Sequence, residues 1–138
     1  MERVIEMSSE GPIKNRPSKK EIAISFLQLV VEGKVREAFL QYLGPRFCHH
    51  NPYFEGDAES LLRAMEEDVS NNPNKLIEIK QTIEEEDSVV VFSHVKQNQD
   101  DLGWAIVHIF RFQDEKIVEL WDLAQSIPEN SPNENGVF

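Results

Sequence analysis

Cysteine is almost absent from this sequence, and that absence excludes two kinds of site. Cys48 is the single cysteine among the 138 residues, so the chain holds neither an internal disulfide nor a cysteine-rich zinc site. Such a composition is typical of the reducing cytoplasm. Because free cysteine usually behaves as a small buried hydrophobe, we predict a packing role for Cys48 and not a nucleophilic one.

Basic residues are also few. Lysine and arginine total 14 against 25 acidic residues, which gives a formal net charge of -11. This charge repels phosphate backbones and anionic lipid, so nucleic acid and membrane surfaces are poor partners. No apolar run approaches the roughly 18 to 20 residues of a membrane span, and residues 1–16 contain no signal-peptide stretch. We therefore predict a soluble cytoplasmic protein.

Glycine is scarce, which removes the motifs of nucleotide chemistry. The six glycines are scattered and form no Walker or dinucleotide-binding loop. No Gly-x-Ser-x-Gly segment is present for nucleophilic hydrolysis. No His-x-His or Glu-x-x-His pair places two metal ligands on one local face. The sequence therefore predicts no cofactor and no metal.

What is present fits one globular domain. Hydrophobic residues make up 40% and charged residues 28% of the chain, values typical of a folded domain. Residues 1–17 mix charges with glycine and proline without a lasting period, which predicts a flexible N-terminal arm. The single domain is predicted over residues 18–138, with a C-terminal tail from about residue 126.

Three helices are predicted in the first half of the domain. Their apolar residues recur at helical spacing between start and stop signals. Ser18 and Glu21 indicate a capping box, and Asp57 indicates the N-cap of the third helix. The predicted helices cover residues 18–33, 35–43 and 57–70.

From Lys75 the apolar pattern changes to a period of two, which is typical of strands. Short polar loops between successive strands favour antiparallel pairing. Helices followed by strands are the order of an α+β domain. We predict N-terminal helices packed on a strongly curved, mostly antiparallel sheet. The predicted strands cover residues 75–83, 89–96, 104–112 and 117–125, with a short strand or loop at 46–54.

Asp122 is the strongest candidate for a chemical role. In the last predicted strand it shares a face with Val118, Leu120 and Ala124, because alternate residues point to opposite faces. A carboxylate among apolar neighbours needs a bonded partner, a raised pKa or a solvated cavity. One interpretation is a structural bond to backbone or to Arg111. The other is a general acid or base that faces a cavity.

The register of the last hairpin decides whether His108 lies beside Asp122. A two-residue turn at Asp114-Glu115 puts Val107 opposite Asp122, and His108 then faces the other way. A three-residue turn or one bulge shifts the parity and brings His108 to the side of Asp122. Because the sequence lacks the Asp-Gly pair that favours a tight turn, we predict the shifted parity. A lone core histidine is the alternative.

Further histidines and aromatic residues are predicted to line the cavity. His50 is expected to form a hydrogen-bonding wall, whereas the adjacent His49 should point outward. The other predicted contacts with a ligand come from His94, Tyr53, Phe92, Trp104 and Leu120.

Five segments carry a family resemblance: residues 47–52, 93–98, 109–112, 116–122 with Gln125, and 135–138. Through them the chain resembles the SnoaL-like polyketide cyclases of the nuclear-transport-factor-type α+β cone superfamily. The resemblance implies a conical pocket inside a curved sheet and, commonly, a homodimer through the outer sheet face. It also implies that Asp122 acts as acid and base in an aldol ring closure, with His108 nearby. The subgroup commonly has His at the positions of Leu120 and Phe92, and Asp at that of His108.

Three functions stay open on these grounds. The first is a cofactor-independent acid-base enzyme of the aldol, cyclase or isomerase type, in which Asp122 removes a proton beside the carbonyl of a small hydrophobic compound. His108, His50 or His94 would then hydrogen-bond the enolate. The second is a module that binds a hydrophobic ligand without chemistry, and the third is a structural dimer with a vestigial cavity. A carboxylate open to a cavity favours the first, and one locked to Arg111 or backbone favours the others.

Overall fold

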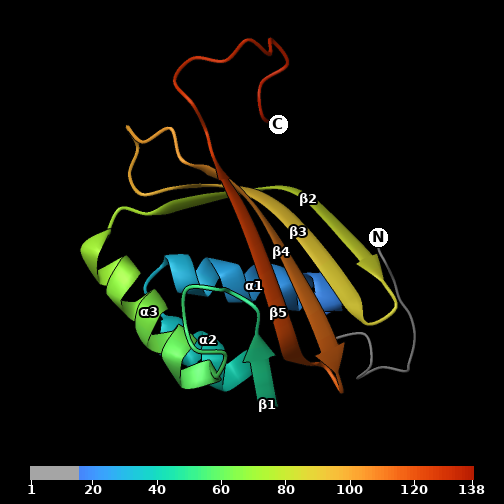
Figure 1. Cartoon of the computed structure of the whole chain (residues 1–138). Coiled ribbons are helices and arrows are strands. Elements are labelled where there is room, and N and C mark those ends of the chain that lie inside the picture. The colour runs from blue at the N-terminus through green and yellow to red at the C-terminus, as the bar shows by residue number, and fades with distance from the viewer. Residues whose placement is uncertain (1–15) are drawn as a thin grey trace.

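The computed structural model describes residues 16–138 (Figure 1), so the predicted arm over residues 1–17 lies almost wholly outside the described part. The described chain forms three helices and then a sheet, with one strand between the second and third helices. The elements are α1 (Lys19–Val31), α2 (Val35–Tyr42), β1 (Leu43–His49), α3 (Ala58–Asn71), β2 (Leu76–Glu85), β3 (Ser88–Lys96), β4 (Trp104–Gln113) and β5 (Lys116–Ser126).

The predicted helix starts are confirmed by their capping bonds. The Ser18 hydroxyl accepts from the backbone N–H of Glu21 at 3.1 Å, and the Glu21 carboxylate accepts from the N–H of Ser18 at 2.7 Å. The Asp57 carboxylate accepts from the N–H of Ser60 at 3.0 Å. These side chains satisfy N–H groups that have no partner within the helix, and they fix where α1 and α3 begin.

The five strands form one sheet in the order β1-β5-β4-β3-β2. β1 runs parallel to β5, and the other neighbours are antiparallel. The predicted α+β class and mostly antiparallel sheet are therefore confirmed, and the segment at 46–54 is a strand that ends at His49 and continues as a loop. In Figure 1 the three helices lie on one face of the curved sheet. We call this the inner face, and the opposite one the outer face.

The hydrophobic core lies between α1 and the inner face. Phe26 of α1 and Phe110 of β4 are both fully buried, with ring centroids 6.0 Å apart in an edge-to-face arrangement. Phe112 and Ile117, at the closed end of the β4–β5 hairpin, are also fully buried. This packing fixes which face of each long strand looks toward the helices.

The β4–β5 hairpin has both the two-residue turn and the shifted parity, which the sequence alone presents as alternatives. Asp114 and Glu115 form a two-residue turn with φ values of 52° and 67°, and Phe112 pairs with Ile117. The register then shifts, so that Arg111 pairs with Glu119 and Val118 is the extra residue of a bulge. Beyond the bulge His108 pairs directly with Asp122. The predicted parity is confirmed, although the tight turn is present.

The C-terminal tail folds back over the outer face. The ring of Phe138 lies 5.3 Å from the ring of Phe92 and 4.8 Å from that of His94, both on β3. The Nζ of Lys80 lies 5.0 Å from the Phe138 centroid, a cation–π contact. Across residues 16–138 no helix has the length and apolar character needed to cross a bilayer.

The β2–β3 turn yields a stability prediction. Glu86 has a φ of 53°, a left-handed conformation that costs a residue with a Cβ roughly 1–2 kcal/mol. We expect Glu86→Gly to raise the free energy of unfolding by about 0.5–1 kcal/mol, after its larger chain entropy is subtracted. Glu84→Gly, in the adjacent strand, should lower it by about the same amount. Urea unfolding of both variants checks this, and a loss of stability in Glu86→Gly would contradict it.

Candidate functional site

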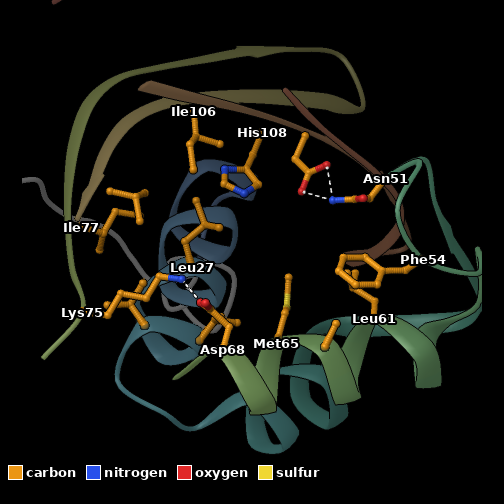
Figure 2. Close-up of a pocket in the computed structure, with 15 residues that line it drawn as sticks. Leu27, Asn51, Phe54, Leu61, Met65, Asp68, Lys75, Ile77, Ile106 and His108 are labelled. Atoms are coloured by element: carbon orange, nitrogen blue, oxygen red, sulfur yellow. Dashed lines mark hydrogen bonds and ion pairs between the residues drawn. The ribbon is translucent and has the colours of Figure 1, made fainter. Parts of the chain in front are cut away.

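A pocket of about 270 Å³ lies between the inner face, α1 and α3 (Figure 2). Most of its wall is apolar and comes from helix residues and from the inward positions of β2, β3 and β4. Five polar residues interrupt this wall: Asn51, Asp68, Lys75, His108 and Asp122. The apolar residues are Leu27, Val30, Val31, Phe54, Leu61, Ala64, Met65, Ile77, Val95 and Ile106.

Asp122 lines this pocket and is held by one side-chain amide. The Nδ2 of Asn51 donates to both carboxylate oxygens at 3.2 Å, the two dashed lines at Asn51 in Figure 2. The Oδ1 of Asn51 accepts from the backbone N–H of Tyr53 at 2.9 Å, which sets the orientation of the amide. Arg111 instead donates to Glu119. The alternative of an Asp122–Arg111 bond is therefore wrong.

The loop that carries Asn51 is fixed by His49, whose predicted outward orientation is wrong. His49 is 5% exposed and lies 2.6 Å, through Nε2, from the carbonyl oxygen of Glu55. Its Nδ1 accepts from the backbone N–H of Asn51 at 3.2 Å. The ring thus carries its hydrogen on Nε2, donates to Glu55, and closes the loop over the pocket.

His108 faces the pocket from β4, directly opposite Asp122 in the register. It is 8% exposed, and its buried Nδ1 has no hydrogen-bond partner among the described residues. Burial lowers the pKa of His108 to about 4, although the negative charge of Asp122 opposes this and the positive charge of Lys75 adds to it. At neutral pH the imidazole is therefore uncharged, and it has one N–H donor.

Sequence reasoning missed a second polar group in the pocket. Lys75 forms an ion pair with Asp68, and the Oδ1 of Asp68 accepts from Gln97 at 3.2 Å. In Figure 2 this pair lies across the pocket from Asn51. The spacing carried a signal, because Asp68 follows Leu61 and Met65 at seven and three residues and so shares their inward face of α3.

The other predicted ligand contacts lie outside the pocket. His50 stacks on Trp121, with ring centroids 4.7 Å apart, and its Nε2 lies 2.6 Å from the Glu119 carboxylate. His94 and Phe92 lie on the outer face under Phe138. The expectation that these residues line the cavity is wrong, and the same holds for three others: Tyr53 is 85% exposed, Trp104 is 43% exposed, and Leu120 is buried in the core.

The arrangement of the pocket suits proton transfer in an apolar space. It offers a carboxylate that is oriented but keeps free lone pairs, and a neutral imidazole on the neighbouring strand. One group of metal-ligand type is found among the described residues, formed by Cys48, His50 and Glu119, and none of these three lines the pocket.

Comparisons with known proteins agree with this fold. The sequence matches the SnoaL-like domain over residues 23–120, and no curated protein sequence matches the chain. AclR, a candidate hydroxylase from Streptomyces galilaeus, has a similar structure, with 21% identity, a TM-score of 0.66 and coverage of 78% of this chain and 88% of that chain. An NTF2-like protein of unknown function from Cytophaga hutchinsonii has 14% identity, a TM-score of 0.66 and coverage of 81% and 94%.

A third similar structure is that of a candidate polyketide cyclase from Acidithiobacillus ferrooxidans. It has 16% identity and a TM-score of 0.64, and the match covers 78% of this chain and 89% of that chain. At these identities the likeness of all three structures shows the shared fold alone.

The buried imidazole predicts how stability depends on pH. The folded chain holds His108 neutral down to about pH 4, whereas the unfolded chain protonates it near its ordinary pKa of roughly 6.5. Between these values the unfolded state binds the extra proton, so stability is lost as the pH falls. From pH 7 to 4 the free energy of unfolding should fall by about 3 kcal/mol more in the wild type than in His108→Leu.

Urea unfolding of both proteins at several pH values measures this difference. A stability difference between wild type and His108→Leu that stays constant over the range would show that His108 titrates alike in both states.

Proposed function

Because the chain belongs to the SnoaL-like domain family, we propose that it is a cofactor-independent acid-base enzyme that acts on a small hydrophobic carbonyl compound. One observation carries the proposal: Asp122 and His108 lie opposite each other on β5 and β4, and both line an apolar pocket. A base and a hydrogen-bond donor in a water-poor space are the requirements for removing a proton beside a carbonyl.

In this proposal Asp122 takes the proton from the carbon beside the substrate carbonyl. The C–H electron pair moves into the new carbon–carbon double bond, and the carbonyl electrons move onto oxygen to give an enolate. Asn51 keeps the carboxylate aimed at the substrate. Return of the proton to another carbon is an isomerisation. Attack of the enolate carbon on a second carbonyl, with the Asp122 proton passed to the new alkoxide, is an aldol closure.

His108 stabilises the enolate oxygen in this scheme. Because burial keeps its pKa near 4, the ring is neutral at pH 7 and donates through one N–H. A neutral donor suits this position, since a permanent cation would pair with Asp122 and reduce its strength as a base. Preorganised donors aimed at developing charge are usually a large part of the stabilisation of such a transition state.

A second candidate is a small-molecule binding module of the same fold. The observation that favours it is the bond from Asn51 to both oxygens of Asp122, which already satisfies part of the carboxylate. In such a module the apolar wall supplies affinity, and the polar groups orient the ligand.

Deuterium exchange beside the carbonyl of small cyclic ketones, followed by NMR, tests the enzyme directly. We expect the wild type to accelerate exchange and Asp122→Asn to lose that acceleration by about 10²- to 10⁴-fold, because the base is removed. Asp114→Asn is the matched control, since Asp114 lies in the exposed β4–β5 turn. This variant should accelerate the exchange of the ketone as much as the wild type does.

Thermal shifts with the same ketones separate the two candidates. Ligands that stabilise the wild type without any accelerated exchange favour the binding module. Equal acceleration by the wild type and Asp122→Asn would rule out Asp122 as the base.

We also propose that two copies associate through the outer face. Its central positions are apolar residues of β3, β4 and β5. Two apolar side chains of this face are more than half exposed: Ile83, on the edge strand β2, is 51% exposed, and Leu123, on β5, is 61% exposed. An apolar sheet face of this kind commonly marks a contact between proteins.

Leu123→Asp tests this association. A charge in the centre of an apolar contact should raise the dimer dissociation constant by at least about tenfold, because the carboxylate must lose its water. Leu40→Asp is the control, since Leu40 is 79% exposed on α2, away from the sheet. Light scattering over a concentration series gives the dimer dissociation constant of the wild type and of each variant. A wild type that is monomeric at every concentration would refute the dimer.

A further inference from the structure

The parallel pairing of β1 with β5 gathers three potential metal ligands on the outer face. Cys48 is the register partner of Glu119. His50 follows Cys48 by two residues, and its backbone N–H donates to the carbonyl of Leu120, so the pairing continues past the end of β1. Residues two apart in extended chain point to the same side. The ligand atoms of Cys48, His50 and Glu119 accordingly lie within 4.8 Å of one another.

These atoms need little movement to reach the geometry of a zinc site. With bonds of about 2.3 Å to sulfur and about 2.0–2.2 Å to nitrogen and oxygen, tetrahedral ligands lie roughly 3.4–3.6 Å apart. Because the present separations do not exceed 4.8 Å, the thiol would approach the other two ligand atoms by at most about 1 Å. The Nε2 of His50 and Oε2 of Glu119, now 2.6 Å apart, would separate by a similar amount as an ion replaced the shared hydrogen.

Neighbouring groups already hold two of the three ligands in place. Arg111 donates to the Oε1 of Glu119 at 2.8 Å and so leaves Oε2 directed toward His50. Trp121 stacks on His50 with an angle of 9° between the rings, which restricts rotation of the imidazole. Outer partners of this kind orient the ligands in metal sites.

The charges also suit a divalent cation. Glu119 supplies a carboxylate, the ordinary form of a glutamate side chain at neutral pH. A cysteine loses its proton when it binds a metal, so the thiolate and the carboxylate bring two negative charges to the ion, and the carboxylate also pairs with Arg111. One sulfur, one nitrogen and one oxygen form a set of intermediate softness, which fits Zn²⁺ and not Mg²⁺ or Ca²⁺.

We propose that Cys48, His50 and Glu119 bind Zn²⁺ on the outer face, with the fourth position open to water. The sequence predicts no metal because no single segment holds a pair of ligands on one face. In this site the third ligand, Glu119, comes instead from the neighbouring strand β5. The three residues do not line the pocket, so the site does not depend on the acid-base function.

Co²⁺ titration of the tag-free full chain tests the site, since cobalt takes the place of zinc and reports sulfur ligation. We expect a thiolate-to-cobalt charge-transfer band that saturates at one equivalent and is removed by Zn²⁺. Zn²⁺ alone should raise the melting temperature, because it binds the folded state. A wild type that gives no such band would overturn the proposal.

Three variants assign the ligands. Cys48→Ala should abolish the band, and His50→Gln and Glu119→Gln should each weaken Co²⁺ binding by at least about tenfold, the smallest effect typical even of outer partners. His94→Gln is the matched control, because His94 is another partly buried histidine of the outer face, bonded to the carbonyl of Leu102. Circular dichroism without metal confirms that each variant folds. Unchanged affinity in Cys48→Ala, or an equal loss in His94→Gln, would overturn the site.

Discussion

The bulge at Val118 is the constraint on which the rest of the site depends. One extra residue in β5 turns every later side chain of that strand to the opposite face. With it, Leu120 fills the core, Asp122 reaches the pocket opposite His108, and Trp121 lies outside. A regular hairpin with the same two-residue turn would bury Trp121 and expose the carboxylate. This single bulge thus decides which residues of β5 face the pocket and which face the outside.

The second determinant is the loop after β1, which holds the carboxylate from the side. His49 closes the loop, the Tyr53 N–H sets the amide of Asn51, and Asn51 bonds Asp122. Each hydrogen bond restricts the rotamer or the backbone conformation of the next residue in the series. The pocket therefore combines an apolar wall from the core with a carboxylate oriented by polar bonds, and Lys75 and Asp68 supply a second polar end.

Much of the fold could be predicted from local patterns, and less of the site. Helix caps, such as those at Ser18 and Asp57, and the period of a strand depend on residues close in sequence. The positions of the helices and strands could therefore be predicted well. The face of β3 is harder to predict, because apolar residues occupy both sides of that strand and its alternation gives no direction. Phe92 and His94, predicted to line the pocket, lie on the outer face. His49 faces inward and His50 outward because they continue the alternation that begins at the buried Phe47, and the burial of Phe47 is set by the tertiary fold. The spacing of Asp68 from Leu61 and Met65 indicates the inward face of α3, but its pairing with Lys75 depends on the turn after α3, whose path that spacing does not encode.

The buried imidazole of His108 has a consequence for how the pocket responds to its surroundings. Histidines commonly serve as proton sensors because they change charge within the physiological range. Removal from water takes His108 out of that range. Mild acidification therefore leaves His108 uncharged in the folded protein. The effect of acid on this histidine is a lower free energy of unfolding and not a change in the charge that the ring presents to a ligand.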